Sequence, residues 1–173
     1  MKTVYAAMAF AALGAMPAMA QDYNITVTNN TDQAIAPVIV LDALRAAPIM
    51  FNEDGTMSDD FVTTVLEGDP RPMNGKMPEA VAGPVLGTSG PPGVLIGAGE
   101  TASTDVFLIG TNTLRFYAKG SFTGGDTVIS GVHDISMGGG TFGLNLYDIG
   151  HDEGTNEITQ IGEDAVTVTI TRN

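Results

Sequence analysis

An acidic segment near the C-terminal end of the chain holds its densest group of oxygen-bearing side chains. Within ten positions it contains Asp148, Asp152, Glu153, Asn156 and Glu157, together with two glycines. Calcium takes about six to eight oxygen ligands, and a loop of carboxylates and amides with glycines at its turns supplies them locally. The spacing is not that of an EF-hand loop. The segment therefore predicts either a calcium site or a solvated acidic loop between two strands.

Other kinds of reactive site have weaker support in the sequence. The two histidines, His133 and His151, each precede an aspartate, but their spacing matches no zinc motif. The chain has no Gly-x-Ser-x-Gly segment that would place a serine nucleophile on a strained turn. Paired carboxylates could hydrolyse glycosides, yet the chain lacks tryptophan and has few aromatic residues for sugar stacking. A small exported hydrolase using acidic residues of the 148–157 loop stays open as the alternative to a non-enzymatic domain.

The charge balance separates the classes of partner. The chain has 20 acidic and seven basic residues, a formal net charge of −13 at pH 7. Such a surface repels phosphate backbones, which excludes nucleic acid as a partner, and attracts hard cations such as calcium. No cysteine is present, so no disulfide can stabilise the fold. Stability must come from core packing, strand pairing or a bound ion.

The first twenty residues have the features of an export signal. Lys2 precedes an apolar run at positions 4–13, and Ala18-Met-Ala20 is the small-x-small pattern that a signal peptidase cuts. The apolar run is too short to remain in a membrane, and no other stretch approaches the roughly 18 residues that a transmembrane helix needs. We therefore expect a signal peptide over 1–20 and one exported domain over 21–173, periplasmic or secreted, without stable membrane insertion.

The elements that would position the acidic loop are mainly β-strands. Apolar and polar residues alternate most clearly at 23–28 and 165–171, which is the pattern of strands with one buried face. Further strand patterns occur at 36–41, 94–96, 101–109, 114–118, 127–129 and 141–147. Seven or eight strands, separated by turns, predict an all-β fold of the antiparallel β-sandwich type.

One long segment interrupts this pattern. Positions 46–92 contain most of the prolines and few runs of β-branched residues. We expect one short helix within it, capped by Ser58, with Asp59 and Asp60 in its first turn. The helix should end at Gly68, since glycine is favoured just after a helix.

The order of four segments resembles the spondin-type N-terminal domain family, in the form found as exported bacterial proteins. The opening strand at 23–31 with 36–38 is similar to the first hairpin of that family, and 61–69 is similar to its short helix and acidic turn. Positions 97–101 and 107–112 are similar to its strand leading to a Thr-Asn loop. Finally, Tyr147-Asp148-Ile-Gly150 with Asn156-Glu157 is similar to its Tyr-Asp-x-Gly-Thr loop.

This resemblance implies a β-sandwich similar to C2 domains, with a calcium ion near one end and a function in adhesion or matrix binding in animal members. Carried over by position, the metal ligands would be Asp148, Asp152 and Asn112. The chain departs from the family at His151, where a threonine is expected, and at Thr113, where an aspartate is usual. We thus expect an exported, non-enzymatic binding or adhesion domain, stabilised by calcium, with an extracellular or periplasmic protein or glycan as partner.

Overall fold

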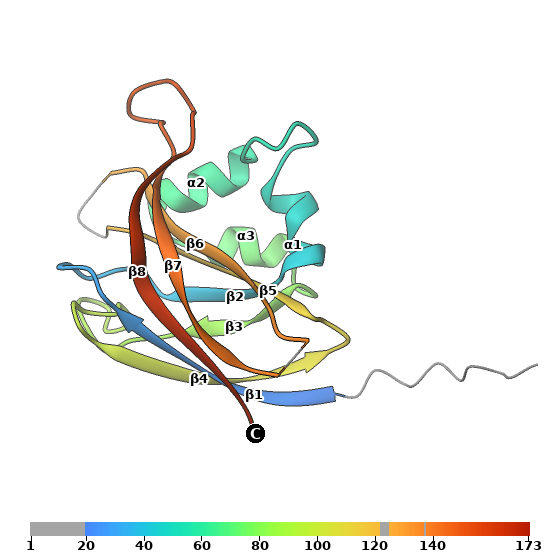
Figure 1. Ribbon diagram of the computed structural model, residues 1–173. Helices are drawn as coiled ribbons and strands as arrows, with labels where there is room; N and C mark the ends of the chain where they lie inside the picture. Colours follow the sequence, from blue (N-terminus) through green and yellow to red (C-terminus); the bar gives the residue numbers. More distant parts are fainter. Residues whose placement is uncertain (1–19, 122–124, 137) are drawn as a thin grey trace, which may run out of the picture.

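Eight antiparallel strands form one sheet, which curves until its two outermost strands lie beside each other (Figure 1). The computed structural model describes residues 20–121, 125–136 and 138–173. The predicted signal peptide thus lies, except for its last residue, outside the described residues. The order across the sheet is β3-β2-β5-β6-β7-β8-β1-β4. The antiparallel all-β class predicted from the sequence is confirmed.

The described part of the chain also contains three short helices, all between the second and third strands. The strands are β1 (Ala20–Asn29), β2 (Val38–Asp42), β3 (Val81–Val85), β4 (Thr101–Ile109), β5 (Thr113–Lys119), β6 (Thr127–Asp134), β7 (Gly140–Asp148) and β8 (Thr159–Arg172). The helices are α1 (Ala43–Met50), α2 (Asp59–Glu67) and α3 (Arg71–Lys76). In the described part of the chain, no helix has the length and apolar character that crossing a bilayer requires.

The inner face of the curved sheet encloses the main hydrophobic core, to which every strand contributes. The predicted alternation explains this burial, because successive side chains of a strand point to opposite faces. Ile25 and Val27 of β1 are buried beside Ile170 and Val168 of β8, their partners in the strand register. The polar residues between them face outward.

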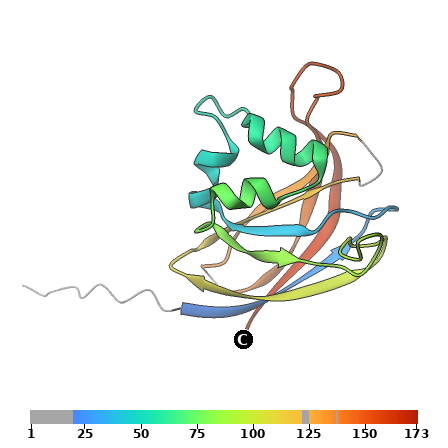
Figure 2. The same cartoon turned by 180° about the vertical axis from the view of Figure 1, so that it is seen from behind.

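The outer face of the sheet is divided between a helix-covered half and an uncovered half. The three helices lie over β2, β5 and β6 (Figure 2), where they enclose a second apolar cluster. Phe61 of α2 is 1% exposed and meets the ring of Tyr117 on β5 edge-on, with 5.2 Å between ring centroids. Across β7, β8, β1 and β4 the outward residues are mostly threonine, serine and asparagine. Most side chains on this half are polar and need no cover, and Phe107 and Ile109 of β4 are exposed apolar exceptions.

The predicted helix after Ser58 is confirmed as α2. The Ser58 hydroxyl accepts a hydrogen bond from the Phe61 N–H at 3.3 Å, and Gly68 ends the helix in the left-handed conformation with φ 70°. The structure adds α1 and α3 to the single helix that the sequence predicted. Asp42 caps α1 through its carboxylate, and Pro48 lies inside this helix. Proline is typical of loops, which is why the pattern did not predict α1.

The strand predicted at 94–96 is not formed. Ile96 and Leu95 make only isolated bridges, to Ile35 and Ser89 respectively. The edge of the sheet is instead β3, whose sequence includes Gly83 and Pro84. Glycine and proline disfavour strands in general. Proline is tolerated on an edge strand, because a residue there can lack an N–H on the side that has no neighbouring strand.

Two polar side chains hold together the loops at one end of the sheet. The fully buried Asn29 amide donates to the carbonyls of Gln33, Ile96 and Gly97 at 2.8 to 3.0 Å. The carboxylate of Glu100 accepts hydrogen bonds from the Ser89 hydroxyl and the Gly97 N–H, both at 2.6 Å. It also accepts from Thr88, through the N–H and the hydroxyl.

These donors favour the charged form of Glu100. The Ser89 hydroxyl contributes most, followed by the Gly97 N–H, and together with Thr88 they lower the pKa of Glu100 to about 2. A carboxyl group with a lowered pKa stabilises the folded state above its unfolded pKa. The contribution is lost as the pH falls from about 4.5 towards 2.

We expect Phe61→Ala to reduce the free energy of unfolding by about 3–5 kcal/mol, since it removes a buried ring from the cluster beneath the helices. Urea unfolding followed by circular dichroism measures the change. Leu44→Ala is the matched control, because Leu44 is 81% exposed and its truncation should change stability by less than about 0.5 kcal/mol. Equal effects of the two substitutions would contradict the described packing.

We expect Glu100→Gln to lower the melting temperature at pH 7, because the neutral amide loses the charge-assisted hydrogen bonds. The difference from the unaltered protein should shrink as the pH falls from about 4.5 towards 2. Melting curves across this range test it, with the exposed Glu163→Gln as control. A difference that stays constant down to pH 2 would show that the carboxylate is not the stabilising group.

Candidate metal centre and adjoining groove

The pairing of β6 with β7 brings two aspartates together at one end of the sheet. Asp148 is the last residue of β7 and pairs with Thr127, the first residue of β6. Asp126 directly precedes Thr127 and therefore lies beside Asp148, although 21 residues separate the two in the sequence. Antiparallel neighbours always place the start of one strand next to the end of the other. The register of the sheet thus sets the first two members of the site.

Asp126 anchors the loop that follows β7. Its side chain is buried, at 3% exposure, and its Oδ2 accepts hydrogen bonds from the N–H groups of His151 at 2.6 Å and Asp152 at 3.1 Å. Its backbone carbonyl accepts from the Ile149 N–H at 3.2 Å. A buried carboxylate needs such donors to offset its loss of hydration. Three residues of the loop, at positions 149, 151 and 152, are thus hydrogen-bonded to Asp126.

A third carboxylate completes the cluster. Glu153 lies in the same loop, is exposed, and offers an oxygen to the space next to the two aspartates. One carboxylate oxygen from each of Asp126, Asp148 and Glu153 lies within 4.8 Å of the others. Three anionic oxygens at this separation repel one another unless a cation or solvent lies between them. We call these three residues the acidic cluster.

The donor set of the acidic cluster fits a hard cation. All three donors are carboxylate oxygens, which suit calcium or magnesium rather than zinc or copper. Calcium takes six to eight oxygen ligands and tolerates irregular geometry, so water and carbonyl oxygens would have to complete the coordination that the three carboxylates begin. The residues present are therefore compatible with calcium.

Gly150 permits the tight winding of the loop. It has φ 65°, and its carbonyl accepts hydrogen bonds from the N–H groups of Thr155 at 3.0 Å and Asn156 at 2.9 Å. A Cβ atom at this position would lie 2.4 Å from the Thr155 hydroxyl and under 3.0 Å from the backbone of Glu157. Glycine is thus required both by the backbone angle and by space. The winding carries Glu153 back over the strand ends.

Lys119 connects this region to the end of α2. It is the last residue of β5, is mostly buried, and its Nζ donates to the backbone carbonyl of Leu66. Burial lowers the pKa of Lys119, while the charges of Asp152 and Asp126 act in the opposite direction. A cation at the C-terminal end of a helix also interacts favourably with the helix dipole. Lys119 therefore offsets part of the negative charge behind the acidic cluster.

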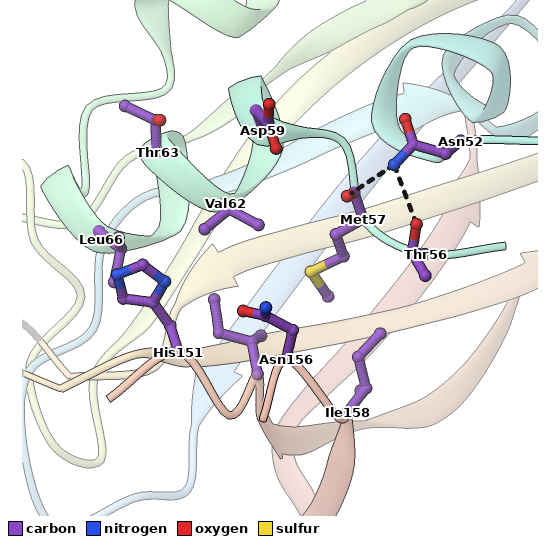
Figure 3. Close-up of a pocket in the computed structure, with 11 residues that line it drawn as sticks. Asn52, Thr56, Met57, Asp59, Val62, Thr63, Leu66, His151, Asn156 and Ile158 are labelled. Carbon is purple, nitrogen blue, oxygen red and sulfur yellow. Dashed lines mark hydrogen bonds between the residues drawn. The ribbon is translucent and has the colours of Figure 1, made fainter. Parts of the chain in front are cut away.

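A groove lies between α2 and the loop at 149–158, with a volume of about 510 Å³ (Figure 3). One wall comes from the start of α2 and the turn before it, including Asn52 and Asp59. The opposite wall comes from the loop, with His151 and Ile158. The remaining lining residues are Thr56, Met57, Val62, Thr63, Leu66, Ile149 and Asn156. The loop that carries Glu153 therefore also forms one side of this groove.

The three metal ligands expected from the sequence do not come together. Asp148 belongs to the acidic cluster. Asp152 contributes its backbone N–H to Asp126, and its side chain is exposed. Asn112 lies in the turn between β4 and β5, where its carbonyl accepts from the Ile135 N–H at 2.8 Å. This turn is at the other end of β5 and β6 from Asp148, so Asn112 cannot share an ion with it.

The two histidines are also far apart. His133 is near the end of β6 opposite to Thr127, and its ring stacks on Phe142 with 3.9 Å between centroids. His151 lines the groove. The strand register therefore places them at opposite ends of β6, and they cannot form the zinc site considered from the sequence.

Asp126 was missed by the sequence analysis because it lies outside the acidic segment. The sequence could have pointed to Asp126 if the strand patterns at 127–129 and 141–147 had been taken as neighbours in an antiparallel sheet. That pairing would have placed the residue before the first strand next to the residue after the second.

Comparisons of the chain with protein-family models, with curated proteins and with solved structures find no match.

Proposed function

We propose that this chain is an exported, non-enzymatic binding domain of the adhesion type, in which a calcium ion held by the acidic cluster stabilises the loop at 149–158. The observation that carries the proposal is the shared use of this loop. It supplies Glu153 to the acidic cluster and His151, Asn156 and Ile158 to the groove. An ion bound to the cluster would thus order one wall of the groove.

Calcium is favoured by the chemistry of the cluster. Asp126 is preorganised by two backbone N–H groups on Oδ2, which leaves Oδ1 for the ion. Asp148 uses Oδ1 to accept from the Gly150 N–H at 2.7 Å, which leaves Oδ2. Hydrogen bonds that orient ligating carboxylates are typical of metal sites. The resemblance to the spondin-type N-terminal domain family agrees with a calcium-dependent extracellular function.

The geometry favours binding over the alternative of a small hydrolase. Retaining glycosidases hold two carboxyl groups about 5–5.5 Å apart and inverting enzymes hold them farther apart, so that a sugar or water fits between them. The acidic cluster instead brings together three carboxylates, with one oxygen of each within 4.8 Å of the others. A shared cation suits three converging carboxylates better than a sugar flanked by two does.

We expect calcium, but not magnesium, to raise the melting temperature of the protein after removal of metals with a chelator. At a calcium concentration about 100 times the dissociation constant, binding to the folded state adds about 2.7 kcal/mol. Differential scanning calorimetry in chelator and in millimolar calcium measures the shift. A melting temperature that calcium leaves unchanged would remove the metal from the proposal.

We expect Glu153→Gln to abolish most of this calcium response while leaving the metal-free melting temperature unchanged or slightly raised, since one of three mutually repelling carboxylates becomes neutral. The Glu153 side chain is exposed and makes no hydrogen bond with the described residues, so its loss should not disturb the loop itself. Glu157→Gln is the matched control, because it removes the same charge from the same loop outside the cluster. Equal loss of the response in both variants would indicate diffuse attraction instead of a site.

We expect the exported protein to begin at Gln21, because Ala18-Met-Ala20 matches the signal-peptidase pattern. N-terminal sequencing tests the predicted start at Gln21. It is applied to protein recovered from the periplasm or the medium and to protein recovered from the cytoplasm. Recovery only from the cytoplasm, with Met1 in place, would contradict export.

A further inference from the structure

The three segments that form the groove carry acidic charge and no lysine or arginine. They are the turn at 51–58, helix α2 and the loop at 149–158. Together they contain Glu53, Asp54, Asp59, Asp60, Glu67, Asp152, Glu153 and Glu157. In the described structure Asp60 is paired with Lys76 of α3, but the other seven make no ion pair. Asp59 lines the groove itself, and the other carboxylates lie on the segments that form it. We call these eight carboxylates the acidic rim. Lys119 acts on the charge of Asp152, and the acidic rim as a whole stays negative.

The floor of the groove is apolar. Met57, Val62, Leu66 and Ile149 line it, and Ile158 is 43% exposed at its edge. Figure 3 shows Met57, Val62 and Ile158 between the helix and the loop. Exposed apolar surface with a polar rim is typical of binding sites, because a partner gains free energy by removing it from water. The volume of about 510 Å³ is large enough for one or two side chains.

Three polar side chains at the groove have no partner within the described part of the chain. Asp59, His151 and Asn156 line it, and none of their side chains makes a hydrogen bond to another described residue. Asn52, in contrast, donates to the Thr56 hydroxyl at 2.9 Å and to the Met57 carbonyl at 3.1 Å. An amide and a carboxylate of this kind can bind the backbone and a basic side chain of a peptide.

We infer that the groove receives a basic peptide segment, in which one apolar side chain enters the floor and flanking lysines or arginines pair with the acidic rim. Charge complementarity favours this occupant over an anionic ligand, which the same rim repels. The inference rests on the proposed function, because the loop that calcium would order is one wall of the groove. It adds the chemical class of the partner.

A peptide with a central leucine and three lysines on each side, labelled with fluorescein, is the probe. Fluorescence anisotropy with the purified protein at physiological salt measures its affinity, in calcium and in chelator. We expect this peptide to bind more tightly than the same peptide with glycine for leucine. The version with glutamates for lysines should not bind.

Two pairs of variants locate the binding. Ile158→Ala should weaken binding about fivefold, because it removes apolar surface from the groove. Its control is Ile161→Ala, which truncates a 52% exposed isoleucine outside the lining and should leave binding unchanged.

Asp59→Asn should weaken binding about twofold to fivefold, because it removes one charge from the lining of the groove. Its control is Asp22→Asn, which changes an exposed residue at the other end of the sheet and should leave binding unchanged. Melting temperatures confirm that each variant is folded.

Two results would overturn the inference. In the first, the leucine peptide does not bind. In the second, it binds no more tightly than the glycine peptide and has the same affinity for all four variants. The second outcome would mean diffuse attraction to an acidic surface. A calcium-dependent melting temperature without peptide binding rejects the groove inference alone. Peptide binding without a calcium response rejects the metal alone and leaves the groove inference supported.

Discussion

The inner face of the eight-stranded sheet is buried because the sheet curves onto itself, since the described residues form no second sheet that could cover it. Every strand contributes to the resulting core, and no disulfide assists. Closure also fixes where each strand begins and ends. The acidic cluster follows from this constraint, since the register of β6 and β7 alone determines that Asp126 and Asp148 are neighbours.

The end of the sheet near the acidic cluster combines unfavourable electrostatics with firm anchoring. Burying Asp126 beside two other carboxylates costs free energy, and the backbone N–H groups of His151 and Asp152 act against that cost. Lys119 contributes a positive charge that interacts with Asp126 and Asp152, and its Nζ is held by the Leu66 carbonyl of α2. The helices thus do more than cover the outer face, because α2 accepts a hydrogen bond from the Lys119 ammonium group and forms a wall of the groove. The sheet, α2 and the loop at 149–158 act together in this region.

Local patterns in the sequence predicted the parts of the fold that depend on local interactions. The alternation in β1 and β8 and the capping of α2 by Ser58 and Gly68 are of this kind. The failures involve long-range pairing: β3 forms despite Gly83 and Pro84 because it completes an edge, and the segment at 94–96 makes only bridges. The same limit applies to the site. Asp148 was identified from the composition of its loop, whereas Asp126 and the separation of Asn112 depend on strand register.

The arrangement of the two outermost strands bears on how copies of the protein behave when they meet. Unpaired strand edges can add a strand from another molecule, which leads to aggregation. Here β3 is five residues long and contains a proline, and its Gly83 lies against Val106 of β4. The two edges lie side by side without pairing as a ladder, so each limits access to the other along the length of β3. Phe107 and Ile109 on the outer surface of β4 are exposed, and the net charge of −13 keeps neighbouring molecules apart.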